Sequence, residues 1–177
     1  MRRFWMPVLL LIAAAAWLLP ARKPTVDAPP SDVRSTETIE THGTGSERDP
    51  YRLNWALLME AERGASADGT ITVPAEIARY DGTHVEISGY LAPPVAVDRT
   101  SELLVMRNRW DGCCIGTPPT AFDCIEATLV QSIPIRGRHL ISFGTIRGRL
   151  RIEPFRVGRF LLGLYRIEEG IVDGLGH

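Results

Sequence analysis

The chain has 177 residues, of which 20 are Lys or Arg and 21 are Asp or Glu, which gives a formal net charge of −1. With 45% hydrophobic residues, this length can form one hydrophobic core, and it predicts one folded domain. The near-neutral balance lacks the basic excess that nucleic-acid-binding proteins carry, and the chain holds no DNA- or RNA-reading motif. We therefore expect no nucleic-acid partner.

Residues 1–21 have the form of an export signal. Two arginines precede an apolar run from Phe4 to Leu19, which is the order of the basic and apolar regions of a signal peptide. The run is somewhat shorter than the roughly 20 residues that span a bilayer, so a cleaved signal peptide and a retained inner-membrane anchor both remain open. Either way, the rest of the chain is expected outside the cytoplasm, in the periplasm. No cysteine directly follows the run, which excludes a lipoprotein anchor.

Residues 22–49 predict a disordered linker. The segment is rich in Pro, Ser, Thr, Asp, Glu and Gly and has few large apolar side chains, so it cannot bury enough surface to offset its ordering entropy. His42 lies in this segment and is expected to be solvated. The folded domain is then expected to occupy residues 50–177.

The N-terminal part of the folded domain predicts one or two helices. Residues 51–62 have leucines at helical spacing, and Asp49-Pro50 is a plausible helix start. Residues 73–82 predict a second, short helix that begins at Pro74 and stops at Gly82.

The rest of the chain predicts five strands. Their apolar residues alternate or form short runs between turns that contain Gly or Pro. In the first strand we expect Val85, Ile87 and Tyr90 to point inward. The fold class is therefore mainly β, as a small five-stranded OB-like barrel preceded by one or two helices. The five strands are expected at residues 83–93, 101–108, 123–132, 141–154 and 160–170.

Three arginines are expected on one face of the fourth strand. Arg147, Arg149 and Arg151 alternate with apolar residues, and Gly148 is expected to shift the register. Such a row is typical of a solvated outer face, and it would also suit a surface that binds an anionic ligand or headgroup.

The segment 108–126 is the candidate functional loop. It holds all three cysteines of the chain, and two prolines that stiffen an extended path lie between Cys114 and Cys124. A stiff loop between two strands is a common place for function. The candidate binding residues are Trp110, Cys113, Cys114, Gly116, Pro118 and Pro119.

One interpretation of these cysteines is a disulfide. Export places the domain where thiols are oxidised, and Cys124 could pair with either Cys113 or Cys114. Closing a loop of about ten residues would stabilise the fold by roughly 2–3 kcal/mol. One cysteine would then remain free.

A second interpretation is a metal site. Cys113, Cys114 and Cys124 could supply three soft ligands for zinc or copper, and the fourth ligand would come from Asp111, Asp123 or His139.

A third interpretation is thiol redox chemistry, which needs a thiol with a lowered pKa. Arg107 and Arg109 lie close to the cysteines in sequence and could favour a thiolate. Some of the cysteines could instead be small buried hydrophobic residues. No motif of a hydrolase or metalloprotease occurs in the chain, so the sequence favours a protein that is not an enzyme.

Several short patterns together resemble one bacterial family. They are P-x-x-I, D-G and V-x-I-x-G-Y-L-x-P within residues 74–93, a cysteine loop followed by Pro-Pro, and G-x-L with L-Y-x-I near the C-terminus. Over roughly residues 51–172, the chain resembles the domain-of-unknown-function family 3299. The resemblance implies an exported OB-like domain whose genes often lie beside ABC-transporter genes, some of them linked to metal uptake. Many members carry a His where this chain has Gly116.

The sequence therefore favours a non-enzymatic extracytoplasmic binding or accessory module. Its expected partner is an inner-membrane complex, such as an ABC-type transporter, and the N-terminal segment would provide a membrane contact. No cofactor is predicted in this interpretation. The alternatives are a zinc- or copper-binding accessory protein and a thiol-redox protein.

Overall fold

The structure is a computed structural model that describes residues 41–112, 116–135 and 141–173. The predicted export or anchor segment and most of the predicted linker lie outside these residues. In the part of the chain that the structure describes, no helix is long and apolar enough to cross a membrane. The elements in chain order are β1 (Tyr51–Arg52), α2 (Trp55–Met59), the 3₁₀ helix η1 (Glu60–Gly64), α3 (Ala75–Ala78), β2 (His84–Ala92), β3 (Arg99–Met106), β4 (Cys124–Pro134), β5 (Ser142–Val157) and β6 (Phe160–Asp173).

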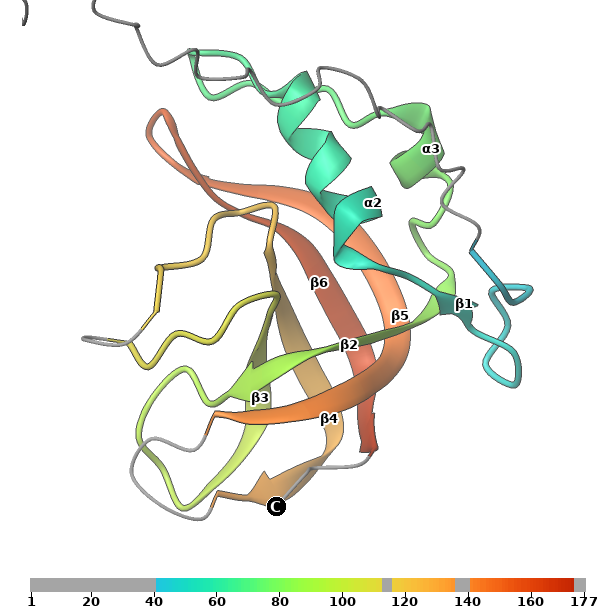
Figure 1. The fold of residues 1–177 in the computed structure, drawn as a ribbon, viewed down its shortest axis with the longest axis vertical. Coiled ribbons are helices and arrows are strands. Elements are labelled where there is room, and N and C mark those ends of the chain that lie inside the picture. Colours follow the sequence, from blue (N-terminus) through green and yellow to red (C-terminus); the bar gives the residue numbers. More distant parts are fainter. Residues whose placement is uncertain (1–40, 113–115, 136–140, 174–177) are drawn as a thin grey trace, which may run out of the picture. The chain divides into compact units, whose positions relative to one another are not determined.

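Five of the strands form a closed ring (Figure 1). The strand order is β1-β2-β3-β4-β6-β5, and β5 pairs back onto β2. Within the ring, β4 and β6 run parallel, and the other neighbours run antiparallel. The prediction of a mainly β, OB-like fold with five strands is confirmed, and β1 adds a sixth strand parallel to β2. The sequence analysis missed β1 because two residues show no periodicity.

The first helix starts later than the sequence analysis predicted. Asn54 caps α2, because its side-chain oxygen accepts a hydrogen bond of 2.9 Å from the backbone N–H of Leu57. The preceding residues are extended instead, since Tyr51 and Arg52 pair with β2. The prediction that Asp49-Pro50 starts this helix was therefore wrong. The second predicted helix is confirmed as α3, which follows Pro74.

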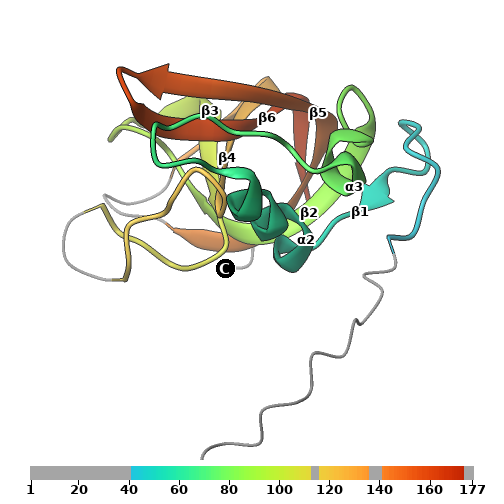
Figure 2. The same cartoon turned by 90° about the horizontal axis from the view of Figure 1, so that it is seen from above.

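Helix α2 lies over one open end of the strand ring (Figure 2). Its Leu57 and Leu58 are buried in the core that the strands enclose. The hydroxyl of Tyr165 on β6 donates a hydrogen bond of 2.7 Å to the carbonyl of Leu58. This end of the ring is therefore closed by a packed helix.

Strand β2 alternates more strictly than the sequence analysis predicted. Val85 and Ile87 face the core as expected, and they are followed inward by Gly89 and Leu91. Tyr90 lies on the opposite face, where its ring packs edge-on against that of Phe143 at 5.4 Å. The inward placement of Tyr90 was wrong, because a strand sends every second side chain to the same face and glycine occupies the inward position before it.

The register shift near Gly148 belongs to β6 and not to β5. Gly148 faces inward and keeps the alternation of β5 intact. Arg147 of β5 pairs with Ile171 of β6, and Arg149 of β5 pairs with Glu168 of β6. The chain of β6 therefore contains one more residue than β5 between these two pairs, and Glu169 within it adopts a positive φ of 54°. The additional residue therefore forms a bulge in β6, which corrects the expectation of a shift at Gly148.

Residues 41–49 differ from the expected linker. The hydroxyl of Thr41 lies 2.6 Å from that of Tyr80, and the carbonyl of His42 accepts a hydrogen bond of 2.8 Å from the N–H of Arg52. The carbonyl of Gly45 accepts another from the N–H of His84 at 3.0 Å. This part of the segment is held by backbone groups, which its polar composition did not indicate. His42 is exposed, as expected.

Candidate functional site

The base of the cysteine loop is closed by a backbone bridge. Trp110 and Gly116 pair as an isolated antiparallel bridge, which brings the two ends of the segment 111–115 together. Gly116 has a φ of +91°, and a Cβ at this position would lie 1.9 Å from the carbonyl oxygen of Arg109. Only glycine fits here without moving the chain. The His that many members of the resembled family carry would therefore require a different backbone path at this position.

The C-terminal half of the loop is stabilised by Asp123. Its carboxylate accepts hydrogen bonds from the N–H and the hydroxyl of Thr120, at 2.6 and 2.9 Å, and its carbonyl accepts one from the N–H of Arg107 at 3.0 Å. The segment that contains Pro118 and Pro119 forms no helix or strand. Asp123 therefore stabilises a turn, which is the usual role of an Asp that bonds the backbone nearby.

Cys124 is the first residue of β4, and among the described residues its thiol has no disulfide partner. The residue alternates with buried Ile125, so it faces away from the core, and it pairs with Met106 on β3. Burial raises the pKa of the Cys124 thiol to about 12, and the negative charges of Asp123 and Glu126 add to this effect. These surroundings disfavour the thiolate that redox or nucleophilic chemistry needs.

The other predicted ligands lie outside the described residues. This applies to Cys113, Cys114 and His139, so a disulfide to Cys124 and the three-cysteine metal site remain predictions. Among residues 41–112, 116–135 and 141–173, no group of three or more His, Cys, Asp or Glu side chains could hold a metal ion.

A mostly apolar pocket of about 330 Å³ lies beside the cysteine loop. Trp110, Asp111 and Gly112 form one side of it, and the connection after β2 forms another. Met106 lines the pocket and is only 1% exposed. It lies on the outer face of β3, because Leu103 and Val105 are the β3 residues that face the core. The loop therefore lies beside the end of the outer face of β3, at Leu104 and Met106. The complete lining is Ala92, Pro93, Pro94, Val95, Ala96, Leu104, Met106, Trp110, Asp111, Gly112 and Ile141.

Of the residues predicted to form the binding loop, the structure places Trp110 at this pocket. Gly116 is its partner in the bridge, and Pro118 and Pro119 are not part of the lining. The sequence analysis missed the opposite wall, Pro93 to Ala96. A signal for it existed, because Pro93-Pro94 repeats the Pro-Pro pair of the cysteine loop and stiffens the chain in the same way.

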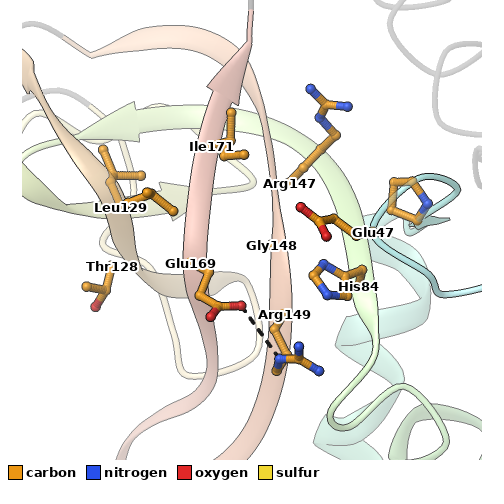
Figure 3. A pocket seen from close by; sticks show the side chains of 11 residues that line it. Glu47, His84, Thr128, Leu129, Arg147, Gly148, Arg149, Glu169 and Ile171 are labelled. Carbon is orange, nitrogen blue, oxygen red and sulfur yellow. Dashed lines mark ion pairs between the residues drawn. The ribbon is translucent and has the colours of Figure 1, made fainter.

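A second, larger groove of about 800 Å³ is lined by residues of β2, β4, β5 and β6 and of the segment before β1 (Figure 3). Figure 3 shows Glu47 and His84 on one side of it and Glu169 on the other. The guanidinium Nε of Arg149 lies 3.8 Å from the carboxylate of Glu169. The groove is thus lined by side chains of both charges.

The predicted arginine row is present on the outer face of β5, but it faces a matching acidic row on β6. A guanidinium nitrogen of Arg147 lies 2.5 Å from the carboxylate of Asp173. The guanidinium of Arg151 donates a hydrogen bond of 3.0 Å to Glu168, which raises its pKa above the usual range. These contacts and the ion pair of Arg149 with Glu169 neutralise the positive charge of the three arginines. The structure therefore supports the interpretation of a solvated outer face over that of an anion-binding surface.

A comparison with solved structures finds a similar fold. No family model and no curated protein matches the sequence. Among solved structures, the fold is similar to the crystal structure of a DUF3299 family protein from Pseudomonas aeruginosa PAO1, with a TM-score of 0.47 and 14% sequence identity. The similarity covers 71% of this chain and 97% of that chain. This is the same domain-of-unknown-function family that the sequence patterns resemble.

Proposed function

We propose that this protein is a non-enzymatic binding module of the extracytoplasmic space that works with an inner-membrane complex. An ABC-type transporter is the candidate partner. The observation that carries the proposal is the apolar pocket between Trp110 and the connection after β2. The pocket would hold an apolar side chain from a segment of the partner protein.

The chemistry of the pocket suits a protein segment. Trp and Met are enriched in protein interfaces, and the flexible thioether of Met106 can adapt to different apolar groups. Val95 lies at the pocket and is 63% exposed, so an apolar surface continues from the pocket to solvent. Of the described residues that line it, Asp111 alone has an ionisable side chain. This lining supports recognition rather than acid–base catalysis.

The compartment and the partner class rest on the sequence. The N-terminal segment has the form of an export signal or anchor, and the resembled family often occurs beside ABC-transporter genes. A transport complex in the inner membrane is therefore the partner that this proposal names.

Photo-crosslinking in the native host tests the proposal. The amino acid p-benzoylphenylalanine replaces Val95 at the pocket or, as a control, Val130 on β4, which is 62% exposed. We expect an adduct with an inner-membrane protein from position 95 and none from position 130. Replacing Trp110 with Ala should abolish this adduct while leaving the far-ultraviolet circular dichroism unchanged.

Two outcomes would contradict the proposal. One is the same set of adducts from both positions, which would show nonspecific proximity. The other is an adduct at position 95 that persists at full yield without the Trp110 side chain, because the pocket would then play no part in the contact.

A further inference from the structure

The hairpin formed by β5 and β6 projects beyond the strand ring (Figure 1). The pairs of β2 with β5 end at Arg149, and those of β4 with β6 begin at Tyr165. Leu150 and Ile152 still form hydrogen bonds with residues 81–83. Beyond them the strands pair only with each other, down to the last pair, Val157 with Phe160. Gly158 and Arg159 form the two-residue turn. The hairpin end therefore extends beyond the closed ring and pairs with none of its other strands.

The end of this hairpin gathers exposed apolar side chains. Phe155, Val157, Phe160 and Leu162 are each more than half exposed, and they make up four of the nine exposed large hydrophobic residues in the described part of the chain. Val157 and Phe160 face each other across the hairpin and so share one face, to which Phe155 also belongs by alternation. Such a concentration of exposed apolar groups marks an interaction surface.

Two arginines lie among these apolar residues in the sequence. Arg156 and Arg159 lie within the hairpin end, and there is no acidic residue between Pro154 and Gly163. The guanidinium of Arg159 lies 5.3 Å from the ring centroid of Phe160. Asp68 of a neighbouring loop senses this charge, because its pKa is lowered mainly by hydrogen bonds with Thr70 and to a smaller extent by Arg156.

The turn of the hairpin is supported from behind. Gly69, with a φ of +82°, lies so close to the hairpin that a Cβ there would be 2.0 Å from the carbonyl oxygen of Arg159. The loop that carries Gly69 is closed by a hydrogen bond of 2.7 Å from the N–H of Ser66 to the carbonyl of Thr70. The apolar side chains are thus presented on a supported element, which lowers the cost of ordering them on binding.

We propose that this hairpin end inserts into the interfacial layer of an anionic phospholipid bilayer. Its apolar side chains would enter the acyl boundary, while Arg156 and Arg159 would contact lipid phosphates. A projecting, convex end with positive charge fits a soft anionic surface better than it fits a preformed protein groove. Each arginine near such a surface should strengthen the contact about fivefold. The inference is independent of the apolar pocket at Trp110.

The test uses the full chain reconstituted into vesicles of phosphatidylcholine and phosphatidylglycerol. An environment-sensitive fluorescent amino acid replaces Phe160, which is 60% exposed, or Phe143, which is 56% exposed and lies on β5 away from the hairpin end. Quenching by phospholipids that carry a nitroxide on their acyl chains reports the depth of each position. This local measurement is needed because the N-terminal segment could bind vesicles by itself.

We expect strong quenching and a blue-shifted emission at position 160, and neither at position 143. Replacing Arg156 and Arg159 with Ser, or omitting phosphatidylglycerol, should reduce quenching at position 160. Equal quenching at both positions, or no quenching at position 160, would overturn the proposal. A blue shift at position 160 that grows with protein concentration in the absence of lipid would also overturn it, because that surface would then join two copies of the chain.

Discussion

Replacing Gly116 with Ala should open the base of the cysteine loop. The substitution has two costs, because the backbone has a φ of +91° and the new Cβ would lie 1.9 Å from the carbonyl oxygen of Arg109. Holding an L-residue in the left-handed region costs about 1–2 kcal/mol. Relieving the clash requires moving that carbonyl and breaking the bridge to Trp110, and each lost hydrogen bond costs about 0.5–1.5 kcal/mol. The closed loop should therefore lose about 2–4 kcal/mol.

Gly112 provides a matched control in the same loop. It has a similar φ of +87°, but a Cβ added there would meet no atom within 4 Å beyond its own chain neighbours. The Gly112→Ala variant thus carries the conformational cost without the clash, about 1–2 kcal/mol. The difference between the two variants isolates the steric contact at the loop base.

Urea unfolding and hydrogen exchange together measure the effect. If the loop and the ring unfold together, Gly116→Ala should lower the free energy of unfolding by clearly more than Gly112→Ala does. If the loop opens locally, the amides around Trp110 should exchange faster in Gly116→Ala while global stability changes little. Equal stability and equal exchange in the two variants would refute the reasoning.

Three further predictions concern the ring. Tyr165→Phe leaves the buried carbonyl of Leu58 without its 2.7 Å hydrogen bond, so urea unfolding should show a loss of about 1–3 kcal/mol; an unchanged midpoint would contradict this role. Gly148→Ala should destabilise the fold far more than Gly163→Ala, because a Cβ meets neighbours at 2.5 Å at the first position and none closer than 3.8 Å at the second; melting temperatures compare them, and equal values would be evidence against the close packing. Burial raises the pKa of the Cys124 thiol to about 12. In a variant whose other two cysteines are replaced by serine, the rate of alkylation of Cys124 should therefore still increase with pH above pH 9. A rate that reaches a plateau below pH 9 would contradict the raised pKa.

Local pattern was enough to predict several elements. All five strands of the ring lie within or close to the predicted ranges, because alternation of apolar residues is a local property of a half-buried strand. The short helix after Pro74 was also predicted from its own residues. The start of α2 was not, since pairing of Tyr51 and Arg52 with a strand more than thirty residues away overrode a helical pattern.

The sequence by itself determined the mainly β class, the five strands of the ring and the position of the cysteine loop between two of them. Only the tertiary structure decided that this loop lies beside Leu104 and Met106 of β3, that the connection at Pro93 forms the opposite wall of its pocket, and that the arginines of β5 face acids on β6. The physical reason is the range of the interactions involved. Burial periodicity depends on neighbours along the chain, whereas a pocket or an ion pair depends on residues that come together only when the ring closes.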